Sequence, residues 1–204
     1  MGTAAVAATV GAVTSPTVRP ATPPTAGGVV VRDATPADLP AVAAIYTHYV
    51  LDTWITFNTE VRTPAEWKQR YEDTIANGPY DLLVATLDGR VAGYVETQAF
   101  RPKPAYFRSV ELSVYTAPDA TGRGLGSALF TELLARLVDT EFHRAYSVIA
   151  LPNDGSVAFH ERFGFVHRGT LSESGYKFGR YLDVAFYERS LDDAPSAPAP
   201  QGAS

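Results

Sequence analysis

Three glycines stand at every second position in the segment Thr121–Ser127, between a strand-like run and a helix-like run. Hydrophobic and polar residues alternate over residues 111–116, and Pro118 and Asp119 interrupt that pattern. Apolar residues at helical spacing then continue to about Leu137. Glycine lets a ligand approach the backbone closely, and the free N–H groups of a first helical turn attract anions. The pattern therefore predicts a phosphate site, most naturally for a pyrophosphate, at residues 121–127.

This glycine segment matches neither of the two commonest nucleotide-binding loops. A Walker loop ends in Gly-Lys followed by Ser or Thr, whereas here Ser127 follows Gly126 directly. A dinucleotide loop has the spacing G-x-G-x-x-G, whereas Ser127 takes the third glycine position after Gly122 and Gly124. Glycines also mark ordinary turns, so a plain loop stays an open alternative on this segment alone.

The composition is that of one ordinary domain and argues against several classes of function. The chain has 204 residues, a net charge of −5 and no cysteine. An acidic chain lacks the basic face of a nucleic-acid-binding protein. Without cysteine there is no disulfide, no thiolate metal site and no cysteine nucleophile, and we expect no bound metal. No apolar run is long enough to cross a bilayer, so no membrane partner is expected.

The two ends of the chain differ in composition from the middle. Residues 1–28 are rich in Ala, Thr and Pro and residues 191–204 in Ala and Pro, which predicts disordered tails around a domain at 29–190. No basic stretch precedes an apolar core at the start, so a secretion signal is not expected and we predict a cytoplasmic location.

The elements that must position the glycine segment follow from periodicity and turn residues. Strands are predicted at 29–32, 82–87, 90–98, 106–116, 145–150, 164–171 and 181–189, and helices at 35–50, 63–76, 124–138 and 154–162. Asp88-Gly89 between the second and third strands favours a tight hairpin turn. This order indicates an α/β (α+β) three-layer sandwich, with a mixed, mostly antiparallel twisted sheet and helices on both faces.

Several separated motifs resemble the GCN5-related N-acetyltransferase (GNAT) superfamily, and in particular its phosphinothricin acetyltransferase branch. Thr121–Gly126 is similar to the acetyl-CoA pyrophosphate loop of that superfamily, although Thr121 stands where Gln or Arg is usual. The other motifs are residues 101–106, 111–115, 151–154, 160–161 and 175–180. The resemblance spans roughly residues 30–190 and implies the acyl-CoA N-acyltransferase fold, whose central strands splay apart to admit the cofactor.

Glu111 and His160 are the two candidate catalytic residues. Alternation with Val110 and Leu112 puts Glu111 on the more polar face of its strand, where a solvated carboxylate is the simplest interpretation. The resemblance implies instead a general base that takes a proton from the acceptor. It also implies a role for His160 as an acid or an assisting base, and the alternative is an ordinary helical histidine.

The resemblance also implies which residues bind acetyl-CoA. The candidates are Ser113, Val114, Tyr115, Thr121, Gly122, Arg123, Gly124, Leu125, Gly126, Ser127 and Asn153. Backbone N–H groups of residues 113–115, freed by a bulge, would stabilise the negative charge that develops on the thioester oxygen. Asn153 would either contact the pantetheine arm of the cofactor or serve only as a turn residue.

The acceptor pocket implied by the resemblance combines basic and aromatic side chains. The candidates are Phe57, Arg101, Lys103, Tyr106, Tyr176 and Phe178. Arg and Lys suit an anionic group on the acceptor, while surface exposure or core packing is the simpler interpretation for each.

The activity implied is direct transfer of acetyl from acetyl-CoA to the primary amine of a small amino-acid-like acceptor, of the phosphinothricin or methionine sulfoximine type. Two alternatives stay open: a peptide or protein N-terminal acetyltransferase, and a non-catalytic acyl-CoA-binding sensor. The family resemblance also implies a homodimer.

Overall fold

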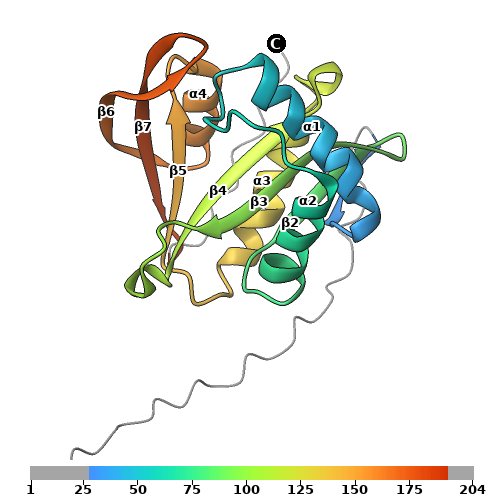
Figure 1. Cartoon of the computed structure of the whole chain (residues 1–204). Helices are drawn as coiled ribbons and strands as arrows, with labels where there is room; N and C mark the ends of the chain where they lie inside the picture. Colours follow the sequence, from blue (N-terminus) through green and yellow to red (C-terminus); the bar gives the residue numbers. More distant parts are fainter. Residues whose placement is uncertain (1–27, 193–204) are drawn as a thin grey trace, which may run out of the picture.

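The computed structural model describes residues 28–192 and folds them around one seven-stranded mixed sheet (Figure 1). The strands are β1 (Val29–Asp33), β2 (Leu82–Leu87), β3 (Arg90–Ala99), β4 (Ser109–Thr116), β5 (Arg144–Ala150), β6 (Val166–Lys177) and β7 (Arg180–Ser190). Their order across the sheet is β1-β2-β3-β4-β5-β7-β6. Every neighbouring pair is antiparallel except β4 and β5, which run parallel.

Helices cover both faces of this sheet, which confirms the predicted three-layer sandwich. The helices are α1 (Leu39–Asp52), α2 (Pro64–Arg70), α3 (Leu125–Leu137) and α4 (Asp154–Arg162), and a π-helical turn at Tyr71–Ala76 continues α2. Gly93 faces Leu129 of α3, whereas the next residue, Tyr94, packs on Tyr115 beneath Tyr46 of α1. Because successive strand residues face opposite sides, α1 and α3 lie on opposite faces of the sheet.

The start of α2 at Thr63 follows from local sequence, as predicted, whereas Thr35 caps a 3₁₀ turn, Pro36–Asp38, that leads into α1. Asp38 accepts the Thr35 N–H at 2.8 Å and pairs with Arg32 at 2.7 Å just before α1. Thr63 and Glu66 form a capping box at α2, in which Glu66 accepts the Thr63 N–H at 2.7 Å. Such caps satisfy backbone donors that have no partner inside the helix.

The central helix α3 carries much of the core. Its buried residues are Leu125, Leu129, Phe130, Leu133, Leu134, Arg136 and Leu137. Burying a Leu or Phe side chain contributes about 1.5–3 kcal/mol, so these residues fix α3 against β1 to β4. The position of the glycine segment before α3 is therefore determined by packing along the whole helix.

Two strand boundaries differ clearly from the prediction. The strand expected at 106–116 begins at Ser109, because Pro104–Tyr106 forms a 3₁₀ turn. The strand expected to end at Leu171 continues to Lys177, because a bulge between Leu171 and Gly175 interrupts the alternation without ending the pairing with β7.

The predicted tails lie outside the described residues, apart from three residues at their inner ends. One of these, Leu191, is only 4% exposed, and its N–H donates to the His143 carbonyl at 3.2 Å. The folded part therefore extends past the predicted boundary at residue 190. Within residues 28–192, no helix has both the length and the apolar character needed to cross a membrane.

The parallel pair β4 and β5 separates partway along its length. Pairing joins Ser109 to Arg144, Val110 to Ala145 and Glu111 to Tyr146, and it stops there although both strands continue. Figure 1 shows β4 and β5 diverging beyond this point. A wedge-shaped gap therefore opens in the middle of the sheet, with Glu111 at its narrow end.

Candidate active site

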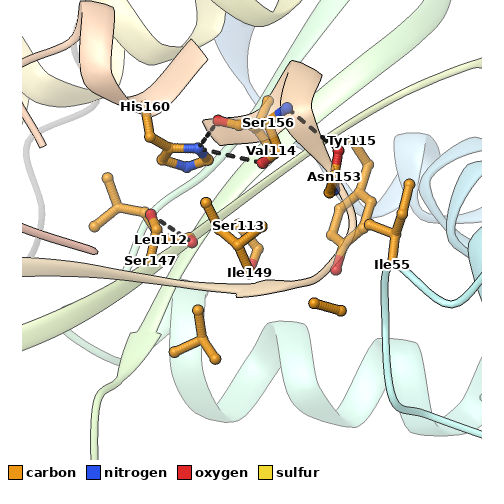
Figure 2. Close-up of a pocket in the computed structure, with 12 residues that line it drawn as sticks. Ile55, Leu112, Ser113, Val114, Tyr115, Ser147, Ile149, Asn153, Ser156 and His160 are labelled. Carbon is orange, nitrogen blue, oxygen red and sulfur yellow. Dashed lines mark hydrogen bonds between the residues drawn. The ribbon is translucent and has the colours of Figure 1, made fainter. Parts of the chain in front are cut away.

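A small open cleft lies in the wedge between β4 and β5 (Figure 2). Its lining residues are Ile55, Leu112, Ser113, Val114, Tyr115, Ser147, Val148, Ile149, Ala150, Asn153, Ser156 and His160. The structure thus brings five predicted site residues together at one cleft: three from β4, one from the turn after β5 and one from α4.

Backbone amides of β4 face this cleft. The register of β4 against β3 is continuous from Val110 to Thr116, and the Ala117 N–H donates to the Ala92 carbonyl at 2.8 Å. Since N–H groups of an antiparallel strand alternate in direction, Leu112 and Val114 direct theirs away from β3, toward the gap. The predicted bulge was wrong: the separation of β5, rather than an extra residue in β4, leaves these donors facing the cleft.

The glycine segment has the geometry of an anion site. Gly122 and Gly124 both have a φ of 75°, a left-handed conformation that favours glycine, and a Cβ at either position would meet nothing within 4 Å. The first α-helical bond of α3 runs from the Ala128 N–H to the Gly124 carbonyl at 3.0 Å. The N–H groups of the three preceding residues, 125–127, therefore lie ahead of the helical ladder and can bind a phosphate.

The remaining residues of this segment surround the start of α3. Thr121 donates its hydroxyl to the Pro118 carbonyl at 3.3 Å, and Arg123 is exposed to solvent. Gly126 lies against the ring of Phe159 on α4, 3.5 Å from the position that a Cβ would take. Because Phe159 precedes His160, the anion site and the cleft are joined through α4.

Glu111 is half-buried at the narrow end of the wedge and is not itself a lining residue. Its Oε1 accepts a hydrogen bond from Gln98 Nε2 at 3.1 Å. Burial raises the pKa of Glu111, and the Gln98 hydrogen bond and the charge of Arg101 act in the opposite direction. A carboxylate whose pKa is raised by burial is a stronger base than a solvated one.

His160 lies at the opposite side of the cleft, on α4, and is 5% exposed. Its Nδ1 is 2.8 Å from the Ser156 carbonyl (Figure 2). A carbonyl can only accept, so Nδ1 carries the proton and Nε2 is left as an acceptor. Burial lowers the pKa of His160, while the Ser156 bond raises it by a smaller amount. The imidazole is therefore neutral near pH 7.

Asn153 begins α4 and has the local role considered from the sequence. Its Oδ1 accepts the Ser156 N–H at 3.2 Å, which caps the helix. The side chain also lines the cleft, so its amide nitrogen remains the group that can donate to a ligand.

Two of the predicted acceptor-binding residues lie close to the Glu111 end of the wedge. Arg101 is held over the ring of Phe100 at 4.4 Å, and its positive charge reaches Glu111. Tyr106 meets the same Phe100 ring edge-on at 6.0 Å. Lys103 is exposed and precedes the 3₁₀ turn that contains Tyr106.

The structure does not bring the other predicted acceptor-binding residues into the cleft. Tyr176 and Phe178 point outward from the end of β6 and are 61% and 57% exposed. Phe57 packs on Gly175, where a Cβ would overlap its ring. The inward-facing Lys177 donates to the Thr56 carbonyl at 2.8 Å. This part of β6 therefore anchors the loop between α1 and α2, which carries Ile55 to the cleft.

Sequence reasoning missed several residues of the site. Ser147 and Ile149 alternate along β5 and gave no signal beyond an apolar strand. Ser156 is four residues before His160, a spacing that puts both on one helix face and could have been used. Gln98 could be found only from the register that pairs it with Glu111. Within residues 28–192, no group of three or more acidic or histidine side chains is arranged to hold a metal ion.

Residues 47–165 match the model of the acetyltransferase (GNAT) family. A phosphinothricin N-acetyltransferase of Streptomyces coelicolor is 48% identical over 165 residues, covering 80% of this chain and 96% of that protein. An L-methionine sulfoximine/L-methionine sulfone acetyltransferase of Pseudomonas aeruginosa is 37% identical over 171 residues, covering 82% and 98%. The crystal structure of a GNAT superfamily phosphinothricin acetyltransferase from Sinorhizobium meliloti in complex with AcCoA has a TM-score of 0.77 and 35% identity, covering 85% and 96%.

Proposed function

This chain belongs to the acetyltransferase (GNAT) family, and on that premise we propose that it acetylates the primary amine of a small amino-acid-like acceptor of the phosphinothricin or methionine sulfoximine type. The protein is an acetyl-CoA-dependent N-acetyltransferase. One observation supports the proposal most directly: the wedge between β4 and β5 has a half-buried carboxylate, Glu111, at its narrow end.

The described residues fit acetyl-CoA along the length of the cleft. The amides of residues 125–127 and the open space over Gly122 and Gly124 suit the pyrophosphate. Leu112 and Val114 offer backbone donors along the gap, because β5 no longer pairs with β4 there. The pantetheine arm can take the place of β5 and accept these hydrogen bonds. When bound, acetyl-CoA supplies the thioester carbonyl that the amine attacks.

Glu111 is the proposed general base. The acceptor arrives as an ammonium ion and must lose a proton before its nitrogen can form the new amide bond. The raised pKa of Glu111 keeps the carboxyl basic enough to take that proton, and the Gln98 hydrogen bond holds one oxygen in place.

Backbone amides and His160 are the proposed partners of the carbonyl and the departing sulfur. The N–H of Val114 can donate to the carbonyl oxygen as it gains negative charge, and a preorganised donor of this kind contributes strongly in a cleft that excludes water. His160 Nε2 is an acceptor in the resting state, so it suits the role of assisting base, and it can pass a proton to the departing thiolate only after receiving one.

Arg101, Lys103 and Tyr106 are the proposed contacts of an anionic group on the acceptor. Arg101 is the best supported of the three because its charge already reaches Glu111. An acceptor carboxylate or phosphinate beside Arg101 would place a neighbouring amine near the base. For Phe57, Tyr176 and Phe178, the acceptor-binding role stays a prediction that the geometry of the cleft does not favour.

The test is the substitution Glu111→Gln, which keeps the shape of the side chain and removes its basicity. We expect kcat/KM for phosphinothricin to fall at least about 100-fold, measured by CoA release, with acetyl-CoA affinity by calorimetry unchanged. Glu141→Gln, at an exposed glutamate before β5, is the matched control. Wild-type activity in Glu111→Gln would exclude Glu111 as the base.

An acceptor panel separates the remaining alternatives. Phosphinothricin and methionine sulfoximine should be better acceptors than free protein amino acids and than short peptides with a free N-terminus. Preference for the peptides would favour an N-terminal acetyltransferase instead. Acetyl-CoA binding without CoA release on any amine would favour a non-catalytic sensor.

The homodimer, the cytoplasmic location and the domain bounds 29–190 remain predictions that rest on the family resemblance and on composition. Exposed apolar side chains along β6 and just after it, including Leu171, Tyr176 and Phe178, are compatible with a contact between subunits. Sedimentation of the purified chain measures the oligomeric state directly.

A further inference from the structure

Four polar side chains form a connected chain on the α1/α2 face of the sheet. Arg70, at the end of α2, pairs with the buried Glu96 at 2.8 Å and donates to Gln98 Oε1 at 3.3 Å. Gln98 in turn donates from Nε2 to Glu111 at 3.1 Å. In the register of β3 and β4, Gln98 stands directly across from Glu111, and Glu96 stands across from Ser113. All four side chains therefore lie on the face that carries the proposed base.

The direction of each hydrogen bond in this chain is fixed by chemistry. A guanidinium can only donate, so Gln98 must present its carbonyl oxygen to Arg70. That leaves the amide NH₂ group facing Glu111, which must accept through an oxygen that carries no proton. The Arg70–Glu96 ion pair is at the other end of the chain from Glu111, and Glu96 is buried there.

We propose that Gln98, oriented by Arg70, is a positioning residue that holds Glu111 Oε1 as a proton acceptor and sets the acid limit of the pH range in which the enzyme works. The proposal rests on the proposed role of Glu111 as the base. Gln98 does not line the cleft, and its hydrogen bond to Glu111 is the contact through which we expect it to act on the reaction.

The other charged and titratable groups around Glu111 divide by sign. Arg101, from the loop after β3, favours the ionised carboxylate, whereas Glu96 on β3 opposes it. Tyr115 lies further along β4 on the same face, and Tyr146 pairs across from Glu111 on β5. Gln98 is the neighbour that donates a hydrogen bond to the carboxylate. Burial and Glu96 disfavour the ionised carboxylate, so removal of Gln98 should make Glu111 harder to ionise.

Two substitutions at Gln98 test this by a pH profile. Gln98→Leu removes the donor at similar size, and Gln98→Glu replaces it with a second acid. With saturating acetyl-CoA, we expect the acid limb of kcat/KM for one fixed acceptor to move up by about one pH unit in Gln98→Leu, and further in Gln98→Glu. On the acid side of the limb, this corresponds to about tenfold lower kcat/KM. ¹³C NMR titration of the Glu111 carboxyl in the free protein should show the same order.

Gln69→Leu is the matched control, because Gln69 also donates to a carboxylate, that of Asp73 at 2.8 Å, on the exposed surface of α2. It should leave the limb in place. An unmoved limb and an unmoved Glu111 titration in Gln98→Leu would overturn the proposal. Failure of the proposed function would be seen in a different experiment. Wild-type activity in Glu111→Gln would exclude Glu111 as the base, whatever the NMR titration of Glu111 shows in the Gln98 variants.

Discussion

At the scale of residues, the protonation of the two proposed catalytic side chains depends on hydrogen-bond partners. Sequence spacing can identify the partner of His160 but not the partner of Glu111. The types Glu111 and His160 were predicted, but their protonation follows from burial and from two hydrogen-bond partners. The partner of His160 is one helical turn away, at Ser156, and was within reach of a sequence argument. The partner of Glu111 is on another strand, so Gln98 emerged only with the register.

The substitution Gly124→Ala tests whether the glycine segment before α3 binds the phosphate of acetyl-CoA. The left-handed φ of 75° should cost an alanine about 1 kcal/mol of stability, and its Cβ would enter the open space where a phosphate approaches. We therefore expect lower stability in urea unfolding and weaker acetyl-CoA binding in calorimetry.

Gly155→Ala provides the matched comparison. A Cβ added at Gly155 would also meet nothing within 4 Å, but this glycine lies inside α4, where alanine is favoured over glycine by about 1 kcal/mol. This variant should gain stability and bind acetyl-CoA normally. Equal stability and equal binding for both variants would contradict the assigned role of Gly124.

At the scale of elements, local chemistry was readable and long-range pairing was not. Both caps, Thr35 on the 3₁₀ turn before α1 and Thr63 on α2, were predicted, because a cap needs only residues within one turn. The Asp88-Gly89 turn was predicted for the same reason, and both residues have positive φ. The continuation of β6 past Leu171, beyond a bulge, was not predicted, because it depends on pairing with β7.

The entry to α1 should make stability depend on pH. Hydrogen bonding to Arg32 and Thr35 lowers the pKa of Asp38 from 3.8 to about 2. A lowered carboxyl pKa contributes stability above its unfolded value, and that contribution is lost as the pH falls from about 4 toward 2. We expect Asp38→Asn to lose about 2 kcal/mol at pH 7 in urea unfolding, and to approach the wild type at pH 2.

The exposed Asp154 provides the comparison for this effect. Asp154→Asn should change stability at pH 7 by much less, because water solvates that carboxylate in the folded and unfolded chain alike. A gap between wild type and Asp38→Asn that stays constant from pH 7 to pH 2 would contradict the role assigned to the ionised Asp38.

At the scale of the whole molecule, the site is a consequence of sheet topology. Residues 109–111 pair with residues 144–146, and the strands then part, so the cleft exists only because two distant segments stop pairing. No periodicity in either strand encodes that divergence. The family resemblance implied that the strands splay apart. The patterns of the residues themselves predicted only the anion site at the glycine segment and the three-layer sandwich.

Hydrogen exchange followed by NMR should detect the wedge. Without ligand, the amides of Leu112 and Val114 should exchange faster than those of Ser113 and Tyr115, which face β3. Acetyl-CoA should slow Leu112 and Val114 selectively. Inorganic pyrophosphate is the control ligand: it should slow only the amides of residues 125–127. Uniform exchange along β4, or no response to acetyl-CoA, would contradict the proposed placement of the thioester arm.

The direction of the β4 amides has an evolutionary consequence. Donors for the thioester belong to the main chain, which every amino acid except proline supplies, so mutation rarely erases them. Side chains that contact the acceptor can meanwhile diverge from one lineage to another. Selection for a new amine can therefore proceed without rebuilding the acyl-donor half of the catalyst.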